Sequence, residues 1–249
     1  MGSLEKNATL NRYSIWSINV FCHLVIIPAI IYGEWWMLLY SFIWWQFVHI
    51  TAGTSGYHRY WTHNSFKIGK WYEIYSQIIG LFGNPGPALV WIGVHRDHHK
   101  YVDTEKDPHS PKHKGFWWVY TSGWFQAGFR YIPTEREDLK DWLSLSKNSS
   151  LKWFYDNYLK LHALIILIFF LIDPLLLVFG YCLPIVFANH GYGLINAYCH
   201  RHGEPSNNLL IALITGGEGW HLNHHNDQNK YRFGEIDPGA RFIKWLQVQ

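Results

Sequence analysis

Residues 15–32 read IWSINVFCHLVIIPAIIY and contain no Lys, Arg, Asp or Glu. A helix crosses the hydrocarbon core of a bilayer with about 20 predominantly apolar residues, so this stretch is long enough to span a membrane. Residues 35–56 (WWMLLYSFIWWQFVHITAGTSG) are equally free of charge. A second pair of apolar stretches, 161–172 (LHALIILIFFLI) and 175–195, flanks a turn at Asp173-Pro174. The pattern predicts an all-α integral membrane protein with four transmembrane helices in two hairpins.

The basic residues are unevenly placed relative to these hairpins. Neither connection, Gly33-Glu34 or Asp173-Pro174, contains a Lys or Arg, so all 21 basic residues lie beyond the other end of the spans. Because cytoplasmic segments carry the excess of basic residues, we expect both termini and the polar segments to face the cytosol. The net charge of +3 then reflects topology, and nothing points to a nucleic-acid partner. A length of 249 residues suits a single domain, 1–249.

Three further segments connect the spans. Residues 71–81 (WYEIYSQIIGL) are predicted to form an interfacial helix that ends at the Gly- and Pro-containing run 83–87. The aromatic stretch 116–129 (FWWVYTSGWFQAGF) suits a membrane surface, and the charged segment 134–147 leads back to the third span. The unclustered cysteines argue against a disulfide framework or an iron–sulfur cluster: Cys22, Cys182 and Cys199.

Nine of the sixteen histidines are concentrated in short boxes. These are His58-x4-His63, His95-x2-His98-His99 and His221-x2-His224-His225, with His200 four residues after Asn196. Positions i, i+3 and i+4 share one face of a helix, so one helical turn can present each of the last three clusters. Residues i and i+5 diverge by about 140° on a regular helix. His58 and His63 therefore converge only if the helix ends between them, or they bind different ions.

Nine imidazoles are too many for one metal ion and indicate two. All-nitrogen ligation suits Fe, Zn or Cu. A structural zinc site is normally a closed set of four ligands, so redox or hydrolytic chemistry at two metals is the better interpretation. Imidazole ligands usually donate their other N–H to a carboxylate or carbonyl, and three carboxylates lie close enough in sequence to serve: Asp97, Asp107 and Glu218.

The remaining histidines are given other roles. Those in or beside the spans are expected to be hydrogen-bonded or pore-lining: His23, His49, His162 and His190. An exposed or hydrogen-bonding role is expected for His109, His113 and His202.

These boxes resemble the membrane-bound Δ9-type fatty acyl desaturases. The resemblance also includes Glu218-Gly219-Trp220 before the last box, the run 103–110 (DTEKDPHS), the motif 115–118 (GFWW) and the tail 235–239 (EIDPG). It implies a mushroom-shaped protein with four transmembrane helices and a cytosolic cap holding a di-iron centre. In that family nine histidines ligate the two irons and an asparagine holds a water on one of them. The matching positions are His58, His63, His95, His98, His99, His200, His221, His224, His225 and Asn196.

The sequence departs from the family at one motif. Where relatives commonly have a histidine before the Gly-Trp of the aromatic stretch, residues 120–124 read YTSGW.

The activity implied is O2-dependent insertion of a cis double bond, Δ9 by resemblance, into a saturated acyl chain. The sequence does not decide whether the acyl chain is attached to CoA, to acyl carrier protein or to a membrane lipid. An apolar tunnel would fix which carbons lie beside the irons. We expect its walls to include Trp45, Gln46, Thr51, Gly53 and Trp91, with Trp45 and Gln46 at its end, although small residues in membrane helices also serve close helix packing.

Electrons are expected from a separate protein. The sequence has no His-Pro-Gly-Gly haem motif, no cysteine cluster and no Gly-x-Gly-x-x-Gly fingerprint, which favours a cytochrome b5-like or ferredoxin donor. Basic residues of the cap could dock such an acidic carrier. Two alternatives stay open: a hydroxylase of the same histidine-rich class, and a membrane haem or metal-handling protein that uses the histidines in the spans.

Overall fold

The structure is a computed structural model that describes residues 2–121 and 136–248. These residues form helices, and an isolated bridge between Asn207 and Trp220 is the one β pairing within the two ranges. The first range contains α1 (Gly2–Leu24), α2 (Ile26–Tyr32), α3 (Trp35–Val48), the π-helix η1 (His49–Thr62), α4 (Trp71–Gly80), α5 (Ala88–Tyr101), α6 (Pro111–Lys114) and α7 (Phe116–Thr121). The second contains α8 (Arg136–Leu145), α9 (Ser149–Ile172), α10 (Pro174–Leu177), the π-helix η2 (Val178–Cys182), α11 (Leu183–Gly193), the π-helix η3 (Leu194–Tyr198), α12 (Leu209–Ile214), α13 (His221–Asn226) and α14 (Pro238–Val248).

Three described helical segments are long and apolar enough to cross a membrane: Asn7–Tyr32, Ser149–Ile172 and Pro174–Tyr198. The predicted span at 35–56 is helical as well, but it is not among these three. Its many Trp residues and its polar end, HITAGTSG, make it less hydropathic than the others. It still directs large apolar side chains outward, with Trp35 74% and Ile43 59% exposed.

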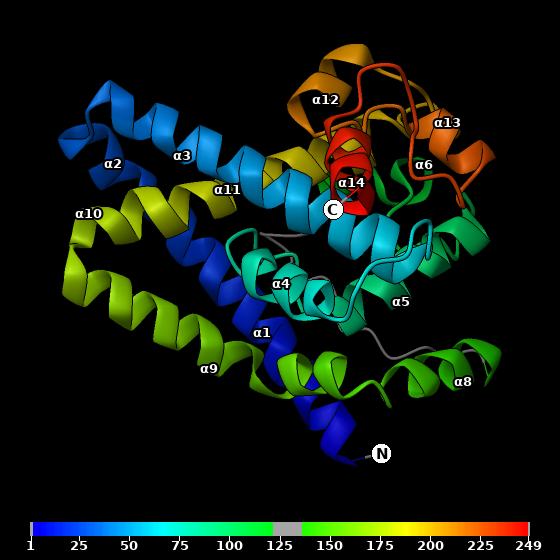
Figure 1. The fold of residues 1–249 in the computed structure, drawn as a ribbon, viewed down its shortest axis with the longest axis horizontal. Coiled ribbons are helices and arrows are strands. Elements are labelled where there is room, and N and C mark those ends of the chain that lie inside the picture. The colour runs from blue at the N-terminus through cyan, green and yellow to red at the C-terminus, as the bar shows by residue number, and fades with distance from the viewer. Residues whose placement is uncertain (1, 122–135, 249) are drawn as a thin grey trace.

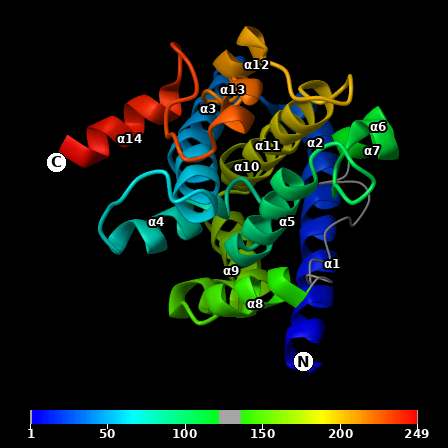
Figure 2. The same cartoon turned by 90° about the vertical axis from the view of Figure 1, so that its right-hand side faces the viewer.

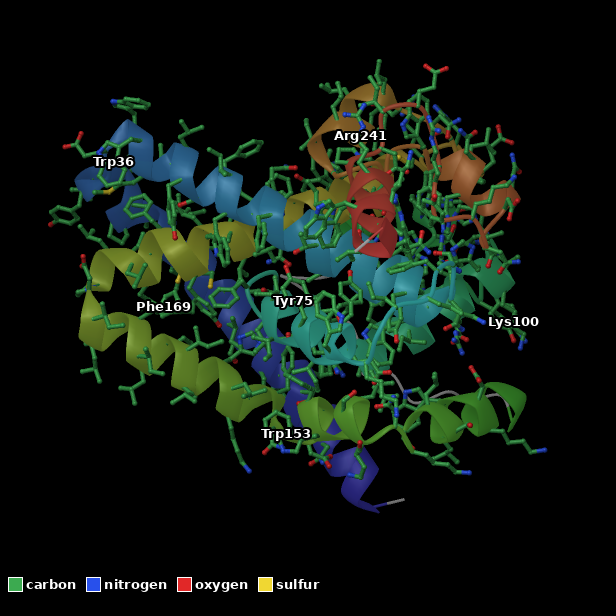
Figure 3. All side chains as sticks on the ribbon, viewed as in Figure 1. Trp36, Tyr75, Lys100, Trp153, Phe169 and Arg241 are labelled. Carbon is green, nitrogen blue, oxygen red and sulfur yellow. The ribbon has the colours of Figure 1, made fainter. Side chains whose placement is uncertain are left out.

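The long helices extend from one end of the molecule (Figure 1). The connection between α2 and α3 and the one between α9 and α10 both lie at the left of that view, while α5, α12, α13 and α14 gather at the right. Figure 2 shows α14 on one side of this group and α1 on the other. Side chains divide in the same way: Trp36 lies at the left end and Lys100 at the right end of Figure 3.

The predicted connecting elements are present where the structure describes them. The helix expected at 71–81 is α4, and the charged segment contains α8. Of the aromatic stretch 116–129, α7 accounts for the first six residues, and 122–129 lie outside the described residues.

A buried polar network connects three long helices with the loop that precedes α5. Asn19 Oδ1 accepts hydrogen bonds from Asn84 Nδ2 (2.6 Å) and Asn189 Nδ2 (3.0 Å). The Tyr158 hydroxyl donates to Asn84 Oδ1 (2.8 Å) and accepts from the backbone N–H of Gly86 (3.1 Å). Buried amides are costly without partners, so these bonds fix where α5, which carries the second histidine box, begins relative to α1, α9 and α11.

Candidate metal centre and its cavities

The histidine boxes come from four segments that are far apart in the sequence. His58 lies in η1 and His63 directly follows it, while α5 carries the second box and α13 the third. Asn196 and His200 were expected on one helical turn. Instead, η3 contains Asn196 and ends at Tyr198, so His200 lies beyond the helix. The fold brings the nine histidines together in two groups. The helices that carry the second and third boxes, α5 and α13, both lie at the right of Figure 1.

The first box converges because its helix is wide. A π-helix pairs residues five apart, and the backbone N–H of His63 donates to the carbonyl of His58 (3.3 Å). The two rings consequently lie on one face, with centroids 4.9 Å apart. The divergence of about 140° applies to a regular α-helix, so both histidines can serve one ion.

The nine histidines form two groups that could each hold a metal ion. Ligand nitrogens within each group lie within 4.8 Å of one another. One group has five members, His58, His63, His95, His99 and His224, and the other has four, His98, His200, His221 and His225.

Distances between Nε2 atoms describe both centres. In the five-histidine group, His58 and His224 are 3.0 Å apart, His95 and His99 3.0 Å, and His99 and His224 2.8 Å. In the other group, His221 is 2.9 Å from His200 and 3.2 Å from His225.

Three carboxylates orient one imidazole each. Nδ1 of His58 lies 2.6 Å from Oε2 of Glu218, and Nδ1 of His98 lies 3.0 Å from Asp107. When Nδ1–H donates to the carboxylate, the lone pair of Nε2 is left to face the centre of the group. The structure thus places Glu218 beside His58 and Asp107 beside His98.

The third carboxylate is not the one that the sequence analysis expected. Asp97 was expected beside a ligand, but it lines a surface hollow together with Arg96 and Asp141. Nδ1 of His200 instead pairs with Asp103 (2.8 Å). Asp103 has a left-handed backbone, φ 55°, in the turn after α5, and it belongs to the run DTEKDPHS quoted above. That turn brings it to a residue almost a hundred positions away, which local spacing does not reveal.

Burial favours the neutral form of most of the clustered imidazoles. It lowers the pKa of His95, His98, His221 and His224 well below the ordinary value. Burial, with neighbouring histidines, lowers the pKa of His99 to about 3 and that of His225 to about 2. Neutral imidazoles have the free lone pair that a metal ligand needs.

The two groups fit metal ions rather than a hydrogen-bonded histidine cluster. Neutral Nε2 atoms without a proton repel when they face each other, and Nε2 of His63 is buried without any hydrogen-bond partner. Ligands at right angles around an ion with metal–nitrogen bonds of about 2.1 Å lie about 3 Å apart, as these nitrogens do.

His109 was not expected at the centre. It is buried, and its ring stacks on His98 with centroids 4.2 Å apart. Burial lowers its pKa to about 3, and neither ring nitrogen has a hydrogen-bond partner. The only sequence signal was its place after Asp107-Pro108.

Two cavities meet at the centre. The larger, about 860 Å³ including its open part, extends from Arg12, Ile15 and Trp16 of α1 toward the centre. The smaller, about 370 Å³, extends on between η1 and the third box. Both are lined by Trp91, His95, Tyr192 and Asn196.

The expected tunnel residues separate into two sets. Gly53 and Trp91 line the smaller cavity, and Trp91 also lines the larger one. Trp45 is buried against Phe187 instead, outside both cavities. Gln46 Nε2 donates to the carbonyl of Ile214 (2.6 Å), and Thr51 Oγ1 accepts from the Tyr75 hydroxyl (2.9 Å). The Trp16 wall has no local sequence signal, because α1 meets the site only in the fold.

Comparisons with known proteins agree with this site. The family model described as fatty acid desaturase matches residues 33–229. The chain is 34% identical over 206 residues to an acyl-CoA 5-desaturase of Anemone leveillei, covering 78% of this chain and 60% of that protein. It is 33% identical over 218 residues to an sn-1 stearoyl-lipid 9-desaturase of Synechocystis sp., covering 80% and 66%.

A second sn-1 stearoyl-lipid 9-desaturase, from Anabaena variabilis, is 31% identical over 216 residues, covering 80% of this chain and 76% of that protein. The chain spans about 60% of the length of the first plant relatives it matches. The residues that the family model matches include every histidine of the two groups. The chain belongs to the fatty acid desaturase family.

Proposed function

We propose that the chain is an O2-dependent fatty acyl desaturase that inserts a cis double bond, at Δ9, into a saturated acyl chain at a di-iron centre. One observation carries the proposal: two groups of clustered imidazoles adjoin a cavity of mixed apolar and polar lining. The names of the relatives support acyl chains as the substrate class.

We assign one iron to each of the two histidine groups. His58, His63, His95, His99 and His224 would hold one iron, and His98, His200, His221 and His225 the other. Asn196, which lines both cavities, would hold a water on the second iron. Glu218, Asp107 and Asp103 fix the tautomers of their histidine partners.

The irons, when bound, supply the O2 chemistry that removes hydrogen from two neighbouring methylenes, a task that no side-chain acid or base performs on an unactivated C–H bond. Zinc would occupy such nitrogen sites but has no redox chemistry.

The chain itself contributes position and water exclusion. Trp91 and Tyr192 form the walls where the two cavities meet, so an acyl chain threaded through them passes beside His95 and Asn196. Holding the reacting carbons in one place decides which bond is oxidised, and apolar walls keep water away from the oxidant.

The membrane arrangement belongs to the same proposal. Residues 1–249 form one desaturase domain in which 35–56 is the fourth span, the spans form two hairpins, and the histidine-bearing end with both termini is the cytosolic cap. The exposed apolar side chains of α3 and the absence of basic residues at 33–34 and 173 support it. The acyl substrate is carried on CoA, acyl carrier protein or a lipid, and a separate cytochrome b5-like protein or ferredoxin supplies electrons.

The test is expression in a host that lacks unsaturated fatty acids, followed by mass spectrometry of its lipids. We expect a new monounsaturated acyl chain with the double bond at C9, and none from the His224→Ala variant. Oxygen from labelled O2 appearing in the product would contradict the proposal and indicate hydroxylation. A saturated profile from iron-loaded enzyme supplied with a donor would refute it as well.

A further inference from the structure

Helix α14 buries one face and leaves the other open. Ile243 and Leu246 are buried in a cluster that also contains Tyr72 of α4. On the opposite side of the helix Arg241 and Trp245 are exposed, and Trp245 exposes 57% of its surface. No other element of the described ranges covers this outward side.

The outward side of α14 is divided lengthwise into two flanks. Residues three apart share one side of a helix, whereas residues two apart point in nearly opposite directions. Phe242 and Trp245 form an aromatic flank, with ring centroids 5.9 Å apart. Lys244 and Gln247 form a polar flank, and both are exposed. An aromatic flank beside a polar, basic one is typical of a helix that lies along a membrane surface.

The direction of α14 agrees with that pattern. The long helices α3 and α9 extend from the left of Figure 1, and Figure 2 looks along that direction. In Figure 2, α14 extends sideways, away from the other helices, and α4 lies on the same side. The outward residues of α4 are apolar and exposed: Trp71, Ile74 and Ile78. Because the long helices are the proposed spans, α14 runs along the plane of the bilayer and continues the apolar surface of α4.

The first turn of α14 is joined to the segments that carry two histidine boxes. Asp237 Oδ1 accepts hydrogen bonds from the backbone N–H of Ala240 and from Nη1 of Arg59, both at 2.9 Å. The backbone N–H of Gly239 donates to the carbonyl of Gly216 (3.0 Å). The position of α14 is therefore fixed relative to η1 and to the turn that precedes the third box.

We propose that α14 is seated in the headgroup region of a phospholipid bilayer, with its aromatic flank toward the acyl chains and its polar flank in water. Tryptophan suits this boundary, because its ring is apolar and its N–H needs a polar partner. The helix adds two exposed cations, Arg241 and Lys244, and residues 238–248 contain no acid, which suits a layer of anionic phosphates. The inference rests on the proposed membrane arrangement.

The experiment measures the surroundings of single nitroxide labels on the metal-free full chain. The protein is reconstituted in vesicles of equal amounts of phosphatidylcholine and phosphatidylglycerol. Labels are attached to Trp245→Cys and Gln247→Cys, a matched pair on one helix. Ile43→Cys of α3 is the lipid control, and Glu105→Cys in the turn after α5 is the water control. The unlabelled blank is the original chain, whose cysteines are buried: Cys22, Cys182 and Cys199.

The readout is the ratio of collisions with O2, which concentrates in lipid, to collisions with a water-soluble nickel complex. We expect the ratio at position 245 to approach that at position 43, and the ratio at position 247 to approach that at position 105. The buried face of α14 fixes its rotation, and the nitroxide side chain is itself apolar, so the label preserves the character of the aromatic flank.

A second measurement leaves the cysteines unchanged. Trp245→Glu and Gln247→Glu add the same charge to the same helix on opposite flanks. Trp245→Glu should lower the melting temperature in vesicles by a few degrees, because a carboxylate is unfavourable beside acyl chains, whereas Gln247→Glu should leave it unchanged. Equal effects of the two variants would overturn the proposed seat.

The outcomes of the labelling separate this inference from the membrane arrangement. A ratio at position 245 equal to that at position 105 would place the aromatic flank in water and overturn the inference alone. Shielding of position 245 from both reagents would assign the flank to another protein surface or a second copy, and it overturns the inference as well. Lipid-like ratios at both 245 and 247 would contradict the division into flanks. If the label at position 43 is in water, the membrane arrangement itself fails.

Discussion

Nδ1 of His58 lies 2.6 Å from Oε2 of Glu218, and the other oxygen of that carboxylate accepts from Nη2 of Arg59 (3.3 Å). One buried acid thus holds both a candidate ligand and its neighbour in the chain. Burial by itself raises the pKa of Glu218, but His58 and Arg59 outweigh that effect and hold the pKa below its ordinary value. The acid is therefore ionised and able to orient the imidazole.

Glu218→Gln should weaken metal binding. The amide keeps the shape of the side chain but loses the charge that fixes the Nδ1–H tautomer of His58. We expect a loss of metal affinity of about 10- to 100-fold, measured by titrating Fe(II) or Co(II) into the metal-free protein. Asp97→Asn is the matched control, since Asp97 lines a surface hollow away from the ligands. An equal loss in both variants would remove the special role of Glu218.

Asp237→Ala should destabilise the protein. Arg59 is fully buried, and Nη1 donates to Asp237 Oδ1 (2.9 Å) while the guanidinium lies 3.9 Å from the ring centroid of Phe233. Removing one member of a buried ion pair costs about 3–5 kcal/mol when the charge is left without a partner. Arg59 keeps its longer contact with Glu218 (3.3 Å), so we expect a loss below that range. Thermal denaturation in detergent should detect it, with the exposed Arg241→Met as the near-neutral control. Unchanged stability would mean that the pair contributes nothing net.

Gly217→Ala should be more harmful than Gly115→Ala. Both glycines have left-handed backbones, φ 108° and 88°, so alanine is strained at each. At Gly217 the added Cβ would also collide with Oδ1 of Asp237, whereas at Gly115 no atom lies within 4 Å. The difference in melting temperature between the two variants measures the effect of the close contact between Gly217, just before the third box, and Asp237 of the tail. Equal losses would show that backbone strain alone decides both.

Trp91→Leu should change the products. Trp91 lines both cavities and stacks on His95 with ring centroids 5.9 Å apart, so a smaller side chain widens the path beside the centre. We expect a broader range of accepted chain lengths or bond positions, read by mass spectrometry of the lipids. Trp45→Leu should lower stability and leave the range unchanged. The reverse pattern would return the end of the tunnel to Trp45, where the sequence had placed it.

Chelation should lower the thermal stability of the metal-loaded protein. Without a cation, lone pairs of the neutral imidazoles of His95, His99 and His224 face each other at about 3 Å, and a ligand that binds only the folded state stabilises it. The melting temperature should fall on chelation and recover with Fe(II). The His221→Ala variant should show a smaller change. A melting temperature insensitive to chelation in the original chain would argue against both ion sites.

The sequence predicted the parts of the site that depend on local periodicity. Positions i, i+3 and i+4 are neighbours on any helix, so the faces of α5 and α13 followed from spacing alone. The convergence of His58 and His63 did not, because it depends on π-helical turns that the spacing rules of a regular helix leave out. The exchange of Asp97 for Asp103 likewise depends on one left-handed residue that redirects the chain toward His200.

The predicted membrane spans differ in how well the sequence reveals them. Their apolar runs are visible in the sequence, but 35–56 has a weaker hydropathy because the same helix continues into η1, which is buried and carries His58. The cavity wall at Trp16 was the least predictable part, because this residue becomes a neighbour of the site only when α1 packs against it.

The buried amide of Asn19 also has a consequence for the order in which the helices assemble during synthesis. Its oxygen is paired by Asn84 and Asn189, which are translated 65 and 170 residues later. In the proposed membrane arrangement, the span that carries Asn19 enters the bilayer with a polar group whose partners do not yet exist, so it is unfavourable in lipid until α11 is inserted. In that arrangement insertion and packing are separate stages, and α11 completes the amide network.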